Sequence, residues 1–310
     1  MLEFIVLLVI LVGVSASPVN PRGQYKDPLL KIFLDHQKNS NGNDIDVSSY
    51  TDIERLLDSK PLTEEDFKRA ENITDIVGDD SSLYSPEYFE GDIVESLKPR
   101  NAMTDLSQRW ANNRVPYLLA NKFSDKERAV IAAAMRTYHD RTCIKFEPKT
   151  SKDRDYLYIY PGLGCASQVG RMGGGQPFLL GRGCVYQGIV EHELMHAVGF
   201  WHEQSRADRD KYVRINWQNI QRGMAYNFDK LSLNQVQHLN EEYDYGSVMH
   251  YGSTAFTNGK GPTIVPLKSG TEIGQRRGLS KVDLRKINKL YECSGKTVVH
   301  KLRIRTKNGK

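Results

Sequence analysis

The chain has 310 residues, of which 39% are hydrophobic and 26% charged, and its formal net charge is +5. This length and composition allow one or two domains with a good core and argue against disorder throughout. The charge is uneven, because residues 17–100 carry 10 Lys and Arg against 18 Asp and Glu, whereas residues 101–310 carry 33 against 19. An acidic segment of net charge −8 therefore precedes a basic region of net charge +14.

An apolar run at residues 4–14 has the length of a secretory signal peptide and is too short to span a bilayer. Small residues close the run, and we expect cleavage after Ala16, so that residues 1–16 are the signal peptide of a secreted, extracellular protein. Glu3 precedes the run without any Lys or Arg, which leaves an N-terminal core helix as the alternative. No other stretch is apolar enough to be a transmembrane segment.

Residues 17–100 contain scattered apolar positions among many Asp, Ser and Asn. We expect them to be weakly structured, with a few amphipathic turns such as Thr63 to Ala70. Their charge suits an inhibitory segment that covers the basic region, and it also suits a segment that merely aids solubility. The sequon that begins at Asn72 predicts glycosylation of this segment.

A cleavage site is predicted where the acidic segment ends. Pro99 shields the preceding Lys98, whereas nothing shields Arg100. A trypsin-like protease is therefore expected to cut after Arg100, which leaves Asn101 as the new N-terminus.

The basic region reads as a mixed α+β domain. Its pattern predicts strands at residues 115–119, 144–146 and 156–160, an amphipathic helix capped by Ser124, and a final helix capped by Ser280. The glycine-rich residues 162–175 lack a phosphate-loop motif and are interpreted as a loop with an edge strand, and no nucleic-acid partner is predicted. Between residue 202 and the final helix the chain is expected to be mostly irregular.

The four cysteines are Cys143, Cys165, Cys184 and Cys293, an even number with no C-x-x-C pair. In a secreted chain they predict two disulfides, and the spacing leaves all three pairings open. Free buried thiols are the alternative.

Residues 192–202 spell the complete zinc-protease motif H-E-x-x-H-x-x-G-x-x-H. On a helix, His192 and His196 share one face and can bind a single Zn²⁺ ion, with Glu193 beside it. Gly199 can adopt the positive φ of a turn that brings His202 back as the third ligand. Three neutral histidines leave a tetrahedral zinc a position for water, so the motif predicts a catalytic site with one zinc per chain.

Downstream, Ser247-Val248-Met249-His250-Tyr251 supplies a second signal, the Met-turn of metzincins. Either signal alone has a plain structural interpretation, because H-E-x-x-H occurs by chance on buried helices and a lone methionine usually fills a core. Together they favour a metalloprotease.

The string HELMHAVGFWHEQSRADRD followed by SVMHYG resembles the astacin family of metzincin endopeptidases, from about Asn101 to Cys293. Glu203, directly after the third histidine, and Tyr251 are marks of that family. The resemblance implies a catalytic domain at residues 101–294, with a mixed twisted sheet and two long helices above an irregular lower half that ends in a helix. Residues 17–100 are then an inhibitory propeptide, and residues 295–310 a basic tail that binds an acidic surface or is simply solvated.

The resemblance also implies roles for single residues. Glu193 is expected to be the general base and Tyr251 to stabilise the oxyanion. Met249 is expected to form an apolar floor beneath the zinc, and Glu203 to bind the amino group freed at Asn101.

A further pattern, F-x-G-D-I at residues 89–93, matches the family's propeptides, whose aspartate ligates the zinc in place of water. Asp92 is thus the expected latency switch. Replacing the nearby Glu90 by alanine is expected to change neither basal activity nor activation. Arg276 is the first candidate, and Arg277 the second, for binding an acidic substrate residue just after the scissile bond.

For the cysteines, the resemblance selects the pairs Cys143–Cys293 and Cys165–Cys184. It implies extended polypeptide substrates, which add as an antiparallel strand along residues 165–170. Two alternatives are weighed: a secreted zinc module without catalysis, against which Glu193 argues, and another metzincin branch, against which Glu203 and Tyr251 argue.

Overall fold

The computed structural model describes residues 58–74, 76–78, 80–94, 106–232 and 238–293. The predicted signal peptide at residues 1–16, the cleavage site between Arg100 and Asn101, and the basic tail at residues 295–310 all lie outside these ranges. Among the helices that are described, none combines the length and the apolar character that crossing a bilayer requires.

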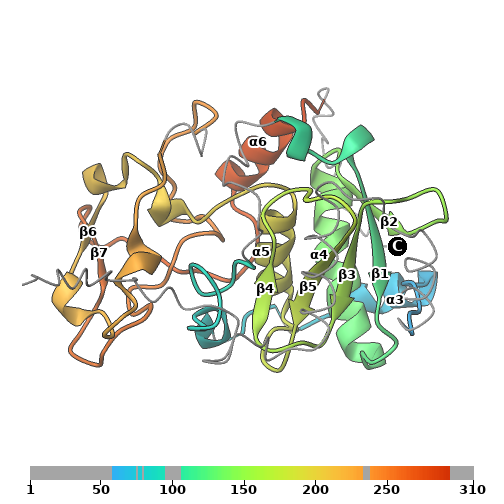
Figure 1. Ribbon diagram of the computed structural model, residues 1–310, viewed down its shortest axis with the longest axis horizontal. Helices are drawn as coiled ribbons and strands as arrows, with labels where there is room; N and C mark the ends of the chain where they lie inside the picture. Colours follow the sequence, from blue (N-terminus) through green and yellow to red (C-terminus); the bar gives the residue numbers. More distant parts are fainter. Residues whose placement is uncertain (1–57, 75, 79, 95–105, 233–237, 294–310) are drawn as a thin grey trace, which may run out of the picture.

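A five-stranded sheet forms one half of the molecule, on the right in Figure 1. Its strands are β1 (Arg114–Leu119), β2 (Lys145–Pro148), β3 (Tyr156–Tyr160), β4 (Cys165–Ser167) and β5 (Gly175–Leu180), in the spatial order β2-β1-β3-β5-β4. Strands β1, β2, β3 and β5 are parallel, whereas β4 is antiparallel to β5 and forms an edge. The α+β fold with a mixed sheet is therefore confirmed.

Two helices, α4 (Asp125–Arg141) and α5 (Gln187–Ala197), pack with the sheet. Helix α4 begins at the predicted capping box, in which Ser124 and Glu127 bind each other's backbone amides. The Tyr138 hydroxyl donates to the Glu191 carbonyl at 2.7 Å and thereby ties α4 to α5. Every residue of α5 after Gln187 is buried, because the helix runs through the centre of the domain.

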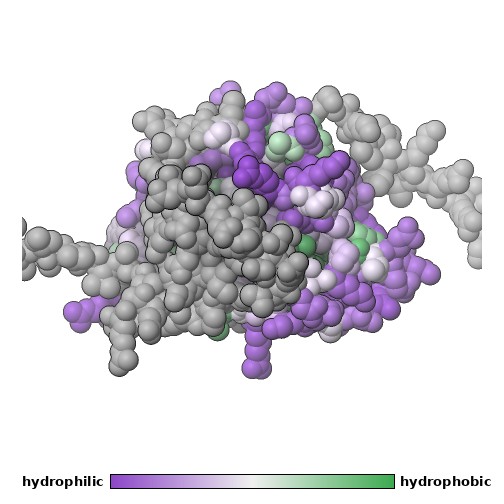
Figure 2. Space-filling view, turned by 45° about the vertical axis from the view of Figure 1, so that its right-hand side comes forward, coloured by the Kyte–Doolittle hydropathy of each residue, from purple (hydrophilic) through white to green (hydrophobic). Residues whose placement is uncertain are grey.

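The other half of the domain, which contains the residues after His202 and lies mainly on the left in Figure 1, is mostly irregular, as predicted. It contains the two-stranded antiparallel sheet of β6 (Val213–Ile215) and β7 (Ile264–Pro266), and it leads to α6 (Lys281–Leu290), which Ser280 caps. Short 3-10 helices also occur along the described chain. Those before β1 are Ala70–Asn72, Asp80–Leu83, Leu106–Gln108 and Ala111–Asn113, and those after α5 are Glu203–Ser205, Arg209–Lys211, Trp217–Asn219 and Ala225–Phe228. On the face shown in Figure 2 the coloured surface is mainly hydrophilic, in keeping with an apolar core inside.

Two disulfides close the domain, Cys143–Cys293 and Cys165–Cys184. The first joins the end of α4 to the end of α6 across 150 residues of sequence, and the second joins β4 to the loop before α5. Both pairs are those that the family resemblance selects.

The described residues between 58 and 94, here called the N-terminal segment, depart from the expected weak structure. Thr63 caps a helix, α3 (Glu64–Arg69), through a capping box with Asp66. The segment also buries Leu62, Leu83 and Ile93 against the domain. The expectation was wrong here because these apolar residues find their partners in the domain that follows, not within the segment.

Candidate metal centre

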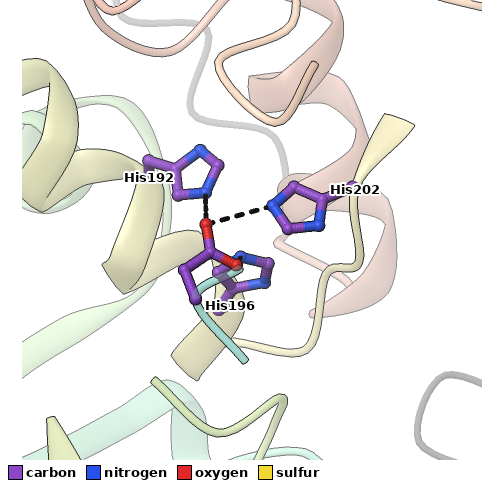
Figure 3. Close-up of side chains that lie close together, drawn as sticks. His192, His196 and His202 are labelled. Atoms are coloured by element: carbon purple, nitrogen blue, oxygen red, sulfur yellow. Dashed lines mark hydrogen bonds and ion pairs between the residues drawn. The ribbon is translucent and has the colours of Figure 1, made fainter. Parts of the chain in front are cut away.

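Three imidazoles converge on one carboxylate in the middle of the molecule (Figure 3). His192 and His196 project from α5, and His202 follows the turn that ends this helix. Gly199 makes that turn with φ 108°, as the motif predicts. Asp92 of the N-terminal segment places Oδ2 3.0 Å from His192 Nε2 and 3.2 Å from His202 Nε2, and Oδ1 3.4 Å from His196 Nε2.

The outer nitrogen of each ring has its own acceptor. Nδ1 of His192 lies 2.7 Å from the Val248 carbonyl oxygen, and Nδ1 of His196 lies 2.7 Å from that of Phe200. Nδ1 of His202 lies 2.6 Å from the Glu90 carboxylate. Because these acceptors can take the Nδ1 protons, each ring in its neutral form presents the Nε2 lone pair to the centre, which is the tautomer that metal ligation requires.

The donor set fits zinc. Three imidazole nitrogens and one carboxylate oxygen, all fully buried, lie within 4.8 Å of one another. His196 Nε2 and Asp92 Oδ1 have no hydrogen-bond partner among the described residues although both are buried, so a cation between them would satisfy atoms that are otherwise costly to bury. Nitrogen and oxygen ligands in this number are those of tetrahedral zinc.

The charges at the centre are strongly coupled. Burial opposes ionisation of Asp92, but electrostatic attraction to and hydrogen bonds from the surrounding imidazoles, His202 first, outweigh it and hold the pKa of this carboxyl well below its usual range. Burial lowers the pKa of His192 to about 3, whereas Asp92 and Glu90 overcome burial at His202 and raise its pKa to about 9. The carboxylate thus favours a positive charge at the centre, and a zinc ion would supply that charge in place of the His202 proton.

Glu193 lies beside this centre on α5 and is fully buried. Neither of its carboxylate oxygens has a hydrogen-bond partner among the residues that the structure describes. Burial, and after it the charge of Asp92, raises the pKa of Glu193 well above its usual range. A buried carboxylate without hydrogen-bond partners is costly for stability, which makes Glu193 a candidate for a functional role.

The Met-turn contacts the segment that carries the zinc ligands through two backbone carbonyls. Its Val248 carbonyl orients His192, and its Met249 carbonyl accepts a hydrogen bond from the Glu203 amide at 3.1 Å. Met249 itself is buried. The ring of Tyr251 lies 4.7 Å from that of His202, centroid to centroid, and its hydroxyl donates to the Glu90 carbonyl at 2.5 Å. Tyr251 therefore lies next to the centre while the N-terminal segment occupies its hydroxyl.

Glu203 has charged partners other than an N-terminus. Lys286 Nζ lies 2.5 Å from its Oε2, and Oε1 accepts from Arg206 Nη1 at 3.1 Å and from the Asp244 amide at 2.9 Å. These cations overcome burial and lower the pKa of Glu203. The expected partner, the amino group of Asn101, lies outside the described residues, so that pairing stays a prediction for the cleaved chain.

The two candidate pocket arginines are placed very differently. Arg276 is buried, and its Nη1 donates to the carbonyls of His250 and Gln275, both at 2.9 Å. Its Nε and Nη2 have no hydrogen-bond partner within the described ranges, and the Asp80 carboxylate lies 3.9 Å from Nη2. Arg277, next in sequence, is exposed. Of the two arginines, Arg276 is the one that offers buried, open donors to a carboxylate.

Sequence reasoning missed two residues that support the centre. Glu90, for which no role in latency was expected, is buried. Its carboxylate also accepts a hydrogen bond from the Ser205 hydroxyl at 2.7 Å, so it fixes the loop that carries Asp92. Asp283 belongs to the capping box of α6, a signal visible in the sequence, but its carboxylate also accepts from the Val248 amide at 2.9 Å and from the Ser247 hydroxyl at 2.6 Å. It thereby ties α6 to the Met-turn.

The N-terminal segment follows the edge of the sheet. Ile93 forms a parallel bridge with Ser167 of β4. The Ser167 amide donates to the Asp92 carbonyl, and the Val94 amide donates to the Ser167 carbonyl, both at 2.9 Å. The segment thus occupies the edge along which an antiparallel substrate strand is expected, but in the opposite direction.

Fold and site together define a zinc metallopeptidase of the metzincin type. A peptidase family model described as Astacin matches residues 102–292. The chain belongs to the astacin family.

Curated relatives agree with this assignment. Zinc metalloproteinase nas-13 of Caenorhabditis elegans is 48% identical over 234 residues, which are 69% of this chain and 52% of that protein. Zinc metalloproteinase nas-4 of the same organism is 50% identical over 220 residues, 67% of this chain and 70% of that protein. The chain spans about half the length of nas-13 and of nas-15, of which 52% and 46% are covered.

A solved structure matches as well. High choriolytic enzyme 1, a hatching enzyme zinc-protease from the medaka fish Oryzias latipes, aligns with a TM-score of 0.57 and 43% identity over 60% of this chain and 94% of that chain.

Proposed function

We propose that this chain is a secreted, zinc-dependent endopeptidase that hydrolyses extended polypeptides and is made as a latent precursor. The observation that carries the proposal is the buried Glu193 carboxylate, free of structural partners among the described residues, next to a cluster of three histidines. A purely structural zinc site has no use for such a base, because its four ligands close the metal.

In the reaction, His192, His196 and His202 would hold the zinc, which when bound would supply a Lewis acid and lower the pKa of a water molecule toward neutrality. Glu193 accepts the proton of that water and later donates it to the leaving amine, so one carboxylate serves as base and then as acid. The Tyr251 hydroxyl, once released from Glu90, donates a hydrogen bond to the substrate oxygen that gains charge.

Latency is proposed to come from the N-terminal segment. Asp92 would supply the fourth ligand of the metal, in the position that water needs. Glu90 accepts a hydrogen bond from the Tyr251 hydroxyl with its carbonyl, and its carboxylate contacts Nδ1 of His202. The parallel direction of residues 92–94 along β4 keeps the segment from lying as a substrate does. A cut after Arg100 by a trypsin-like protease is the proposed first step of activation, and Asn101 is the proposed new N-terminus.

An acidic residue just after the scissile bond is the proposed substrate preference. The buried Arg276 has two donors, Nε and Nη2, without a hydrogen-bond partner among the described residues, and a carboxylate can accept from both in parallel. The segment's Asp80 already places a carboxylate 3.9 Å from this guanidinium. Hydrogen bonds to such a charged pair contribute about 1.5 to 3 kcal/mol, which is roughly tenfold to a hundredfold in selectivity.

The activity is tested on gelatin or denatured protein with the mature chain from Asn101, after cleavage and removal of the propeptide. Wild type is expected to hydrolyse it and to lose activity to a zinc chelator, while Glu193→Gln keeps its zinc and loses turnover. Undiminished hydrolysis by Glu193→Gln at full zinc occupancy removes Glu193 from the role of base.

The preference is tested with a peptide library. Arg276→Ala is expected to flatten an enrichment of Asp and Glu after the cut, whereas the exposed Arg277→Ala leaves it intact. A wild-type enzyme without acidic preference contradicts the pocket assignment.

A further inference from the structure

The first part of the N-terminal segment, residues 58–72, contacts a different part of the sheet from the loop that reaches the metal centre. It packs on α4 and beyond the end of β1, and Figure 1 shows α3 at the right, on the side of the molecule away from β4. The loop that carries Asp92 pairs instead with β4, at the opposite edge of the sheet. The segment therefore contacts the domain at two separated places.

A buried ion pair forms the centre of this distal contact. Arg128 of α4 and Asp66 of α3 are 4% and 3% exposed, and Nη2 of the arginine lies 2.9 Å from Oδ2 of the aspartate. Nε of the same guanidinium donates to Oδ1 at 3.3 Å. Its two terminal nitrogens also donate to the carbonyls of Lys60 at 3.0 Å and Pro61 at 2.6 Å. All these acceptors belong to residues 58–72, so the segment supplies what a buried arginine needs.

Backbone pairing and packing surround the ion pair. The Lys60 amide donates to the Leu119 carbonyl, and the Asn121 amide donates to the Asp58 carbonyl, both at 2.9 Å. These bonds extend β1 by an antiparallel bridge between Ser59 and Ala120.

Apolar contacts enclose the same face. Leu62 is buried, and its amide donates to the Tyr117 hydroxyl at 3.3 Å. The ring of Phe67 stacks on His139 of α4, with centroids 6.3 Å apart, and lies under the Arg136 guanidinium at 5.6 Å. None of these contacts involves a zinc ligand or a residue of the 80–94 loop.

We propose that this face of α4 is a second binding site for the propeptide, independent of zinc, whose occupant is the chain's own residues 58–72. The proposal rests on the proposed latency. Two contacts on one propeptide reinforce each other, since binding at one raises the effective concentration of the propeptide at the other. The overall affinity of the propeptide can then exceed that of either contact alone by roughly a hundredfold to ten-thousandfold. The cut after Arg100 alone then leaves the propeptide bound and the enzyme inhibited, and release requires the distal contact to open.

Hydrogen exchange on the intact, uncleaved chain tests whether the two contacts are independent. Asp92→Ala is expected to speed exchange of amides in residues 80–94, while those of residues 58–72 stay protected because their own contacts with α4 remain. Asp66→Asn is expected to do the reverse, with at least roughly tenfold faster exchange at Lys60 and Leu62. Loss of protection at residues 58–72 in Asp92→Ala overturns the proposal, because the distal contact would then depend on the metal centre.

Two matched variants separate the ion pair from other effects of Asp66. Glu64→Gln removes one negative charge from an exposed position of the same helix and is expected to change nothing. Thr63→Ala weakens the helix cap but leaves the pair with Arg128, so it is expected to cost less protection than Asp66→Asn. If Thr63→Ala matches Asp66→Asn, capping and not the ion pair holds the segment, and the proposed site is wrong.

Retention after cleavage is measured by size-exclusion chromatography of the full chain cut after Arg100, with mass spectrometry to confirm an intact propeptide. The propeptide is expected to co-elute with wild type and with Asp92→Ala, and to separate from an Asp66→Asn, Asp92→Ala double variant. Separation from Asp92→Ala contradicts the proposal. Neither experiment depends on turnover, so a failed peptidase assay leaves their outcome readable.

Discussion

Replacing Lys286 tests how the residue after the third histidine is held. Lys286→Met removes the ammonium group 2.5 Å from Glu203 and keeps an apolar stem of similar length. Both side chains are buried, with 7% and 5% exposed, so the change leaves a buried carboxylate short of one cation. Breaking a buried pair in this way costs about 3 to 5 kcal/mol. Glu203 keeps Arg206 and the Asp244 amide, and we therefore expect a smaller cost, about 2 to 3 kcal/mol.

Helix α6 provides the matched control. Lys289 pairs with Glu241 at 2.5 Å, but 46% of the lysine side chain is exposed, so Lys289→Met is expected to cost less than about 1 kcal/mol. For a domain of this size, 1 kcal/mol corresponds to roughly 2 to 4 °C in melting temperature. Calorimetry of the intact, zinc-loaded chain should therefore show a fall of about 4 to 12 °C for Lys286→Met and about 4 °C or less for Lys289→Met.

Equal melting temperatures for the two variants refute the reasoning, because burial would then not decide the cost. The same measurement on the cleaved chain bears on Asn101. If its freed amino group joins Glu203, the penalty of Lys286→Met shrinks after cleavage; an unchanged penalty means that Lys286 remains the partner.

Three other outcomes follow from the site and the segment. Asp92→Ala in the uncleaved chain should raise basal hydrolysis of a fluorogenic peptide, because water can then reach the metal, and equal latency in wild type and variant contradicts the switch. Tyr251→Phe should lower kcat by roughly tenfold to a hundredfold with a smaller effect on KM, since only a transition-state hydrogen bond is lost; an unchanged kcat makes Tyr251 structural. The Arg128 and Thr63 hydrogen bonds overcome burial and lower the pKa of Asp66, so this carboxylate stabilises the folded chain above the unfolded pKa of 3.8 and ceases to do so as pH falls through the lower folded value. The protection of amides in residues 58–72, corrected for the intrinsic pH dependence of exchange, should fall from about pH 5 to about pH 2 in wild type and fall less in Asp66→Asn, and identical profiles contradict the assignment.

The zinc ligands could be predicted because their arrangement is local. His192, His196 and His202 lie within eleven residues, so helix periodicity and one glycine turn fix their geometry. The cap at Ser124 and the final helix at Ser280 are likewise encoded within a few residues and were confirmed.

The supporting contacts could not be predicted, because they join distant parts of the chain. Glu90 meets His202 across 112 residues, and Lys286 meets Glu203 across 83. Charge and burial at such distances follow from tertiary packing, which periodicity does not describe. Asp92 was proposed only through resemblance to a family pattern, for the same reason.

Helix α3 is an intermediate case. Thr63 followed three residues later by Asp66 resembles a capping box, so the start of the helix was visible in the sequence. Its stability was not, because a six-residue helix is marginal alone and depends on Arg128 and the face of α4.

Anomalous diffraction at the zinc absorption edge, from crystals of the uncleaved chain, tests the central claim most directly. We predict one peak per chain at bonding distance, about 2.0 to 2.2 Å, from Nε2 of His192, His196 and His202 and from a carboxylate oxygen of Asp92. A peak that lacks any of the three imidazoles, or a zinc whose fourth ligand is not Asp92, contradicts the account.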